Sequence, residues 1–272
     1  MPTQRAVFLV SLALIATAFL VGTVTAQESA RITNADELDA VRDDLDGDYV
    51  LAEDIDLSDD NFEPIGDREE TFTGRFDGDG NVITGLNVVR TRSDGVGLFG
   101  AVGRGGVVTD VGLEGVNVEG GGNVGGIVGL NRGNVTYSYV EGDVSGEDSN
   151  VGGVVGWNRG VVRLSYSKAD VTGEIQVGGV AGSTDGGGTV SRTYAVGRVS
   201  ATALSGGIVG KLGDANQLEM HESVLRDSYW NTGTTGQTEA YGNMRMGEGD
   251  VTVENGEDES VIAVLIGDGV GE

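Results

Sequence analysis

The sequence predicts an all-β fold, a parallel β-helix (β-solenoid) of roughly 26–29-residue coils with a short N-terminal capping helix. Three observations predict it. A glycine-rich phrase (VGLFG, VGGIVG, VGGVVG, VGGVAG, SGGIVG) recurs at spacings of 29, 27, 26 and 28 residues and ends at Gly100, Gly129, Gly156, Gly182 and Gly210. A second register of tyrosines follows these glycines. The chain has 49 glycines but only 2 prolines, and a constant period of this length is the signature of a solenoid.

The tyrosine register indicates strands that pair with their equivalents one repeat away. The tyrosines hold equivalent positions of four successive repeats: Tyr139, Tyr166, Tyr194 and Tyr229. In the second repeat Val162, Leu164 and Tyr166 alternate with polar residues, and a period of two is typical of a strand. Coils stacked about 4.8 Å apart place identical residues in ladders. We therefore expect the tyrosine rings to stack on one another down the core.

Two other repeat folds and a helical fold fit less well. The blades of a β-propeller are about 40 residues or longer, which exceeds this period. A β-sandwich would not keep one register through successive units. A helix is disfavoured because each glycine in the centre of the phrase costs about 1 kcal/mol. Two glycine triplets, 120–122 and 186–188, predict turns rather than phosphate-binding loops, since no Gly-Lys-Ser/Thr follows them.

The first segment, residues 1–26, predicts a signal peptide. Arg5 supplies a positive start, an uncharged apolar run extends from Val7 to Val24, and Val24-Thr25-Ala26 fits a small-residue cleavage site. The run is just long enough for the alternative, an uncleaved membrane anchor. The sequence after it contains no apolar stretch long enough to span a membrane; its longest is Val261–Ile266.

The next segment, residues 27–95, predicts an N-terminal cap and the first β-helix coils. Thr33 or Asn34 can cap a helix that ends near Leu45, and Leu38 and Val41 have helical spacing on it. We expect this helix to cover the open end of the solenoid, because such an end exposes a sheet edge. The repeats occupy residues 96–240, and residues 241–272 form an acidic, glycine-rich C-terminal tail.

The repeats resemble GLUG motifs, which are named for a Gly-Leu-x-Gly phrase. Residues 96–100 (VGLFG) carry the phrase, VGGIVG and VGGVVG are close variants, and DSYWNTGTTGQ at 227–237 resembles a closing repeat. The resemblance covers about residues 31–240. It implies a right-handed parallel β-helix like those of pectin lyases and filamentous haemagglutinins, in a surface or adhesin-type protein. The motif also occurs in immunoglobulin-A-cleaving metallopeptidases, whose chemistry belongs to a separate zinc domain.

The charge balance indicates an unusual environment. The formal net charge is −26, with 43 acidic and 17 basic residues, of which only Lys168 and Lys211 are lysines. This composition is typical of a halophilic protein, since molar salt shortens the screening length to about 3 Å and suppresses self-repulsion. The alternative is an ordinary acidic secreted protein. In either case we expect no nucleic-acid partner, because no basic stripe is present to neutralise phosphates.

The sequence predicts no catalytic, cofactor-binding or metal-binding residues. There is no cysteine and one histidine, His221, so thiolate zinc sites and two-histidine metal sites are excluded. We therefore do not expect this chain to have the activity of the metallopeptidases that contain the motif. Carboxylate pairs suited to glycoside cleavage occur in two acidic segments, at Asp54, Asp56, Asp59, Asp60, Asp77 and Asp79. We interpret them as solvated turns. The second segment also lacks the glycine and the acid of a calcium loop, where Val82 and Val88 stand.

Two features do not fit a simple strand pattern. In the glycine phrase the residues at odd and at even positions are both apolar, so both faces of this strand are apolar. The outer face is therefore either covered by a loop or packs against a partner such as a second copy. In the second case Val155→Asp would abolish self-association and leave the fold intact. The column of residues 137, 164, 192 and 227 becomes charged towards the C-terminus, for which the sequence offers no reason.

Together these observations predict an exported, non-catalytic β-solenoid that acts in adhesion or structure at the cell surface or outside the cell. We expect an extracellular glycan or a surface protein as its partner, self-association as a further option, and no cofactor. The alternative is a polysaccharide-active β-helix enzyme, either a lyase or a glycoside hydrolase. A carboxylate pair in an aromatic-lined groove would favour the enzyme.

Overall fold

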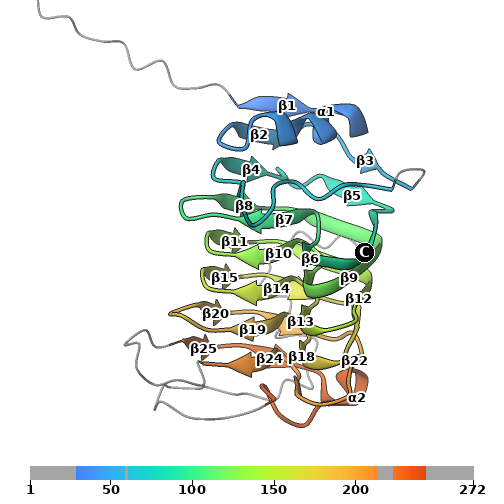
Figure 1. Ribbon diagram of the computed structural model, residues 1–272, viewed down its shortest axis with the longest axis vertical. Coiled ribbons are helices and arrows are strands. Elements are labelled where there is room, and N and C mark those ends of the chain that lie inside the picture. The colour runs from blue at the N-terminus through green and yellow to red at the C-terminus, as the bar shows by residue number, and fades with distance from the viewer. Residues whose placement is uncertain (1–28, 59–60, 214–222, 243–272) are drawn as a thin grey trace, which may run out of the picture.

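The computed structural model describes residues 29–58, 61–213 and 223–242. These residues wind into a β-solenoid of about 6 turns, whose strands lie in parallel layers from β1 (Ala30–Ile32) at one end to β25 (Val224–Arg226) near the other (Figure 1). The predicted parallel β-helix is confirmed. The predicted signal peptide, His221, Asp59, Asp60 and the tail beyond residue 242 lie outside the described residues.

Each coil contributes strands to three parallel sheets, which we number in the order the chain visits them. Sheet 1 contains β1 (Ala30–Ile32), β2 (Asp48–Leu51), β4 (Arg75–Asp77), β8 (Val107–Thr109), β11 (Asn134–Thr136), β15 (Val161–Arg163), β20 (Thr189–Ser191) and β25 (Val224–Arg226). Sheet 2 contains β3 (Ile55–Asp56), β5 (Val82–Thr84), β6 (Asn87–Val96), β9 (Gly112–Gly125), β12 (Tyr139–Gly146), β13 (Ser149–Gly152), β16 (Tyr166–Ser167), β17 (Asp170–Gly173), β18 (Ile175–Gly178), β21 (Tyr194–Ala195), β22 (Val199–Ala201), β23 (Ser205–Gly206) and β26 (Tyr229–Trp230). Sheet 3 contains β7 (Phe99–Val102), β10 (Val128–Asn131), β14 (Val155–Asn158), β19 (Ala181–Thr184) and β24 (Val209–Leu212).

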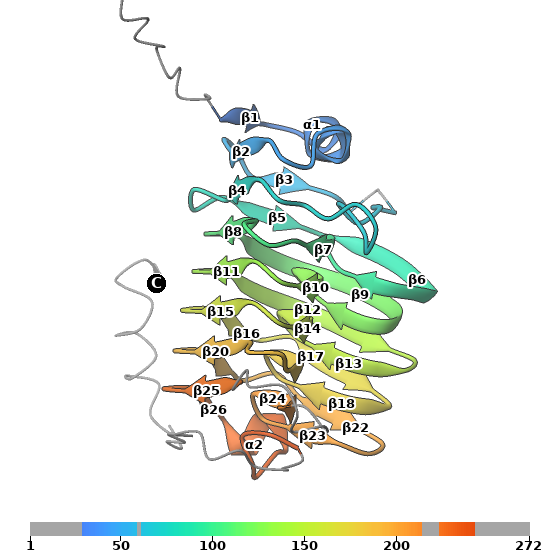
Figure 2. The same ribbon diagram turned by 60° about the vertical axis from the view of Figure 1, so that its left-hand side comes forward.

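The register of the sheets follows the sequence period. In sheet 1, Val135 pairs with Val162, which pairs with Val190, and all three side chains are fully buried. The equivalent valines of successive coils therefore form one apolar column inside the solenoid. Figure 2 shows the three sheets around this core, with the long strands β6 and β9 on the side away from sheet 1. The glycine triplet 120–122 continues β9 and is not the predicted turn, whereas 186–188 does lie in a turn.

The predicted capping helix is present at the N-terminal end, and it is shorter than expected. It consists of α1 (Ala35–Asp39) followed by a 3-10 turn, η1 (Ala40–Asp43). Asn34 is the N-cap, since its side chain accepts a hydrogen bond from the Glu37 N–H at 3.0 Å. Leu38 and Val41 are fully buried, as their helical spacing predicts.

At the other end, Trp230 fills the interior of the last described coil. Its side chain is 3% exposed, and its Nε1–H donates to the Gln237 carbonyl at 2.8 Å. The short helix α2 (Thr232–Thr235) follows it, capped by the Asn231 side chain. The indole packs directly against Gly207, where a Cβ would lie 2.2 Å from the ring. Glycine at position 207 therefore leaves the space that the tryptophan occupies.

The tyrosines do stack, but on the outside of the solenoid, so their predicted position in the core is wrong. In the pairs of sheet 2 the buried partners are the neighbouring Val140, Ser167 and Ala195, which are fully enclosed. The cause is Leu164, whose φ of +52° breaks the strand between β15 and β16. A left-handed residue ends the simple alternation, so Ser165 points inwards and Tyr166 outwards.

The charged column that the sequence left unexplained consists of these left-handed corners. The equivalent residues of successive coils all have φ between 48° and 54°: Asp110, Tyr137, Leu164, Arg192 and Asp227. Their side chains project from the corner between sheets 1 and 2, and Tyr137 is 54% exposed. The corner requires a left-handed backbone conformation, but it buries none of these side chains fully. The residue type can therefore change from coil to coil.

The apolar strip of the glycine phrase is covered by the chain itself. Both parities are fully buried, for example Val154 and Val155. The covering backbone is that of the neighbouring coil: a Cβ on Gly156 would lie 2.4 Å from the Asn123 carbonyl carbon. The strip therefore offers no surface to a second copy, and the expectation that Val155→Asp would spare the fold is wrong, because an unpaired charge there would be buried.

Candidate functional site

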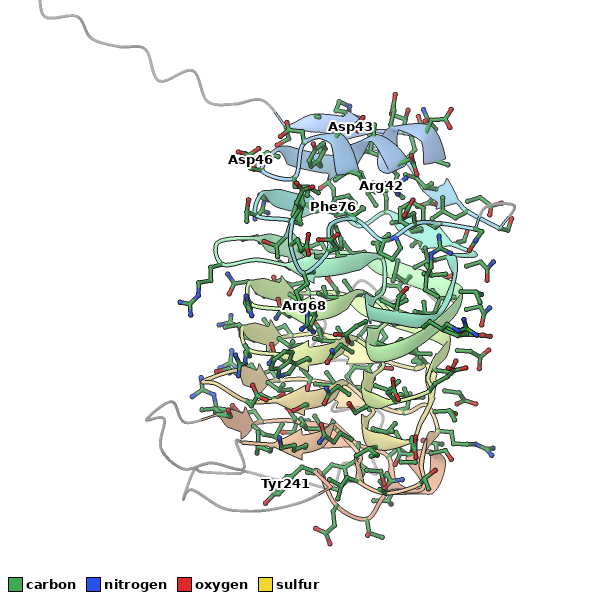
Figure 3. All side chains as sticks on the ribbon, in the orientation of Figure 1. Arg42, Asp43, Asp46, Arg68, Phe76 and Tyr241 are labelled. Carbon is green, nitrogen blue, oxygen red and sulfur yellow. The ribbon has the colours of Figure 1, made fainter. Side chains whose placement is uncertain are left out.

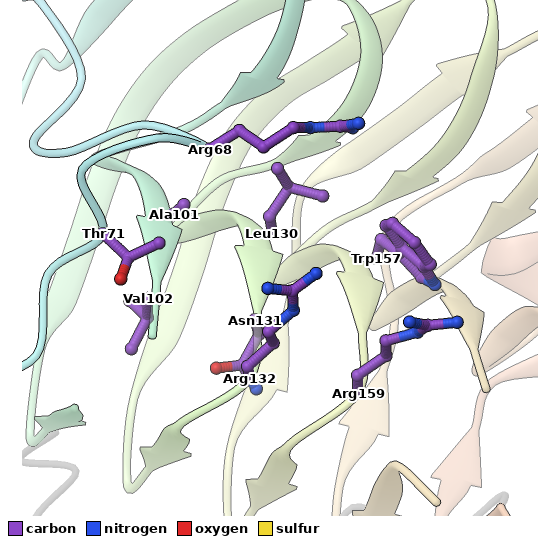
Figure 4. Close-up of a pocket in the computed structure, with 9 residues that line it drawn as sticks. All are labelled: Arg68, Thr71, Ala101, Val102, Leu130, Asn131, Arg132, Trp157 and Arg159. Carbon is purple, nitrogen blue, oxygen red and sulfur yellow. The ribbon is translucent and has the colours of Figure 1, made fainter. Parts of the chain in front are cut away.

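The outer side of sheet 3 carries a column of side chains that changes character along the solenoid. Register pairs place Ala101 beside Leu130, Leu130 beside Trp157, and Ser183 between Trp157 and Lys211. Leu130 is 9% exposed and Trp157 is half-buried. These two apolar side chains form part of the wall of a surface pocket, shown in Figure 4.

A loop from an earlier coil forms one side of this pocket. Residues 61–73 connect β3 to β4 and run along the edge of sheet 3, where Ile65 and Phe72 make single bridges to β7. The Phe72 N–H donates to the Ala101 carbonyl at 3.0 Å. This pairing fixes the part of the loop that bears Arg68 and Thr71, which both line the pocket.

Asp185 holds two of the pocket's side chains in place. Its Oδ2 accepts a hydrogen bond from the Trp157 indole at 2.9 Å, and its Oδ1 pairs with the Arg159 Nε at 2.7 Å. The Arg159 guanidinium carbon lies 4.5 Å from the centre of the Trp157 ring, in cation–π geometry. The Asp185 side chain is 8% exposed and the Arg159 side chain 39%, so the carboxylate is shielded from solvent while the guanidinium stays accessible from the surface.

The other two arginines differ in their partners. Arg68 pairs with Asp94 on β6. Arg132, in the turn between β10 and β11, makes no side-chain hydrogen bond or ion pair with any residue that the structure describes. Figure 4 shows the Arg132 guanidinium between Leu130 and Arg159. The pocket thus combines one uncompensated cation with two others whose orientation is set by carboxylates.

The pocket has a volume of about 120 Å³ and is lined by Arg68, Thr71, Ala101, Val102, Leu130, Asn131, Arg132, Trp157 and Arg159. It contains three of the 17 basic residues in a chain of formal net charge −26. Guanidinium groups present planar forks of N–H donors that match carboxylate, sulfate and phosphate oxygens. The arrangement is therefore suited to hold a small anionic group against an apolar floor.

The stacked tyrosines form a second notable outer feature. Ring centres of Tyr139 and Tyr166 are 4.9 Å apart with planes within 3°, and those of Tyr166 and Tyr194 are 4.6 Å apart within 7°. The Tyr139 hydroxyl donates to Glu114 Oε1 at 2.7 Å. Because each ring covers the face of the next, the ladder presents ring edges and hydroxyls, so it is a poor platform for stacking a sugar.

Burial and nearby carboxylates disfavour ionisation of these phenols. Burial is the main cause that raises the pKa of Tyr166 to about 12, and the charges of Glu141 and Glu114 add to it. Burial likewise raises the pKa of Tyr139, helped by its hydrogen bond to Glu114, and burial raises that of Tyr194. The ladder therefore remains neutral over the whole physiological pH range.

Three of the acidic residues considered for catalysis, Asp54, Asp56 and Asp77, each accept a hydrogen bond from a backbone N–H. Asp54 Oδ1 accepts from the Val82 N–H at 2.8 Å, and Asp56 Oδ1 accepts from the Ser58 N–H at 3.0 Å. Hydrogen bonding by the Ser58 side chain, and after it by the Ser58 N–H, lowers the pKa of Asp56. Asp77 pairs with Arg75 at 2.6 Å and also accepts from the Asp79 N–H. Within the described ranges, no group of three or more acidic or histidine side chains could hold a metal ion.

Sequence reasoning missed the pocket. Its arginines Arg132 and Arg159 lie in the segments Asn131-Arg132-Gly133 and Asn158-Arg159-Gly160, to which the sequence analysis assigned no site. A signal was present, since the two arginines hold the same position in successive repeats and Trp157 lies two residues before the second. The contributions of Arg68 and Thr71 depend on the path of the 61–73 loop and had no sequence signal.

Comparisons with known proteins give two relatives by sequence. A segment is 38% identical over 112 residues to halomucin of Haloquadratum walsbyi, covering 37% of this chain and 1% of that protein. Another match, 37% identical over 134 residues, is to a "Putative Gly-rich membrane protein" of Evansella cellulosilytica, covering 45% of this chain and 16% of that protein. The matches thus span a small part of each relative. No family model matches the chain.

A solved structure has the same fold. It is described as a "putative immunoglobulin A1 protease" from Bacteroides ovatus, with a TM-score of 0.66 and 20% identity over 89% of this chain and 88% of that one. At this identity the likeness concerns the fold alone. The names of the sequence relatives are those of surface-type proteins. No helix in the described residues is long and apolar enough to cross a membrane.

Proposed function

We propose that this chain is an exported, non-catalytic β-solenoid that acts in adhesion or structure at the cell surface or in the extracellular matrix. The similarity to halomucin carries the proposal. The predicted signal peptide at residues 1–26 and the strongly acidic, lysine-poor composition agree with work outside the cell at high salt.

The geometry of the outer surface supports a non-catalytic role. Two carboxylates, Asp185 and Asp94, adjoin the pocket that contains Trp157. Asp185 is committed to Trp157 and Arg159, and Asp94 to Arg68 and Asn123. A general acid and its partner carboxylate must instead be able to exchange protons with a substrate. The stacked ladders favour a rigid rod that presents a surface.

Incubation with polysaccharides tests whether the chain is a binding protein or an enzyme. The mature protein, in molar KCl, is mixed with acidic and neutral polymers, and the polymer mass is followed by light scattering after size exclusion. We expect no polymer to become shorter. Shortening that is lost in Asp185→Asn or Asp56→Asn would establish the alternative, a polysaccharide-active β-helix enzyme.

A second experiment tests the location. The full chain and a variant that lacks residues 1–26 are expressed in a salt-tolerant host, and both are followed in cytoplasmic, surface and medium fractions. We expect the full chain at the surface or in the medium, and the shortened variant in the cytoplasm. Equal retention of both in the cytoplasm would contradict export.

A further inference from the structure

We propose that the pocket between the 61–73 loop and sheet 3 binds an anionic substituent, a carboxylate or a sulfate, of an extracellular acidic polysaccharide. This inference rests on the proposed function and names the ligand class for it. The observation behind it is a concentration of arginines that opposes the charge of the whole molecule. Arg68, Arg132 and Arg159 line one pocket of a chain whose formal net charge is −26.

The ion pairs around the pocket leave it ready for an anion. Asp185 and Asp94 hold Arg159 and Arg68 in position, while Arg132 has no side-chain partner among residues 29–58, 61–213 and 223–242. A guanidinium without a carboxylate partner can form a bidentate contact without breaking an ion pair, and the two oriented guanidinium groups beside it lose little side-chain entropy on binding. The expected contact is therefore from Arg132 to two oxygens of one anionic group.

The size and lining of the pocket favour a sugar unit of a polymer over a free metabolite. Its volume of about 120 Å³ is well below the ~300–1,000 Å³ of pockets that enclose a whole small molecule. It can hold one substituent while the rest of the ligand lies on the surface. Leu130 and Trp157 beside the arginines offer apolar contacts to the C–H groups of a pyranose ring.

The repeat structure favours a ligand with evenly spaced charges. Arg132 and Arg159 follow Leu130 and Trp157 by two residues, and Leu130 pairs with Trp157 across adjacent coils. The two arginines therefore start from backbone positions separated by about 4.8 Å along the solenoid axis. An acidic polysaccharide running along this axis can present successive anionic groups to them. In the next coil the equivalent position is occupied by Asp185, so the column formed by Arg132 and Arg159 ends there.

Calorimetry in molar KCl tests the proposal with four polymers. Polyglucuronate offers carboxylates, dextran sulfate offers sulfates, dextran is the neutral control, and polyglutamate represents an acidic peptide. Molar salt removes long-range attraction and repulsion, so that direct contacts decide the affinity. We expect binding to polyglucuronate or dextran sulfate, and the stronger of the two identifies the substituent.

Binding should also change the fluorescence emission of Trp157, which lines the pocket. The other tryptophan, Trp230, is 3% exposed and lies in the core, so a change in emission reports on the pocket.

A matched pair of variants locates the site. Arg132→Gln should weaken binding about tenfold or more, the usual effect of losing one charged hydrogen-bonding partner. Arg104→Gln changes the net charge equally in an exposed turn between β7 and β8, and it should bind as the wild type does. Circular dichroism checks that both variants are folded. Unchanged affinity in Arg132→Gln would overturn the assignment of this pocket.

The other outcomes separate this inference from the proposed function. Equal binding of dextran, or preferential binding of polyglutamate, would overturn the acidic-polysaccharide ligand. A wild-type chain that binds none of the four polymers and yet occurs in the surface fraction would overturn the inference and leave the surface role standing. Shortening of a polymer would overturn the non-catalytic role, whatever Arg132→Gln shows.

Discussion

At the scale of single residues, glycine has a specific packing task in this solenoid. In the phrase Val-Gly-Gly-Val-Val-Gly, a Cβ on Gly152 would lie 2.6 Å from the Gly182 nitrogen, and one on Gly156 would lie 2.4 Å from the Asn123 carbonyl carbon. The end of sheet 2 and the beginning of sheet 3 therefore touch backbone to backbone. This contact explains both the recurrence of glycine and the burial of apolar residues on both parities of the phrase.

Gly156→Ala tests this close approach. The added methyl group would force two backbones apart, and overpacking of this kind costs about 1–3 kcal/mol of unfolding free energy. Denaturant unfolding followed by circular dichroism measures the loss. Gly122→Ala is the control, because the nearest atom to its Cβ would be 3.4 Å away. Equal stability of the two variants would contradict the packing argument.

At the scale of secondary-structure elements, polar ladders join the coils in addition to the apolar columns. The Asn131 Nδ2–H donates to Asn158 Oδ1 at 2.9 Å inside the corner after sheet 3, and Asn158 Oδ1 also accepts from the Gly160 N–H at 3.2 Å. At the next corner the Ser138 N–H donates to Ser165 Oγ at 3.2 Å. Equivalent polar groups thus satisfy one another across coils, which makes their burial tolerable.

The tyrosine ladder predicts a loss of stability at alkaline pH. The pKa of Tyr166 is about 12 in the folded chain, whereas an unfolded tyrosine has a pKa of about 10. The folded state therefore holds the phenol proton more tightly. The resulting stabilisation is complete below about pH 10 and disappears as pH rises through the folded pKa.

Unfolding of wild type, Tyr166→Phe and Tyr137→Phe at pH values across this window measures the effect. Tyr166→Phe keeps the stacked ring and removes the ionisable group, so its stability should fall less steeply than that of the wild type. The stability of Tyr137→Phe, at a corner where the residue is 54% exposed, should fall as steeply as that of the wild type. Parallel curves for wild type and Tyr166→Phe would contradict the role of burial.

At the scale of the whole molecule, the dominant physical quantity is the formal net charge of −26. Figure 3 shows charged and polar side chains along both edges of the solenoid in this view and at its ends. Five ion pairs within the described residues, such as Lys168 with Glu141, compensate only a few of the acids. Self-repulsion therefore opposes the compact state in dilute buffer.

Salt should stabilise the fold for this reason. Raising KCl from about 0.1 M to about 1 M shortens the screening length from ~10 Å to ~3 Å, so we expect the melting temperature to increase by several degrees. Thermal unfolding by circular dichroism measures it, with sucrose at equal osmolality as the control for solvent exclusion. A melting temperature that stays constant or decreases with salt would contradict the halophilic interpretation of the composition.

The sequence by itself determined the coil and its register, because strands that stack with a constant period place equivalent residues side by side. The stacking of the tyrosines and the start of the first helix at Thr33 or Asn34 were also predictable from spacing and residue type. Only the tertiary structure decided which side of each strand faces the core. Left-handed corners such as Leu164 end the alternation and turn the tyrosines outwards. The pocket likewise depends on a loop that places Arg68 in the same lining as Arg132, an arrangement that no local periodicity encodes.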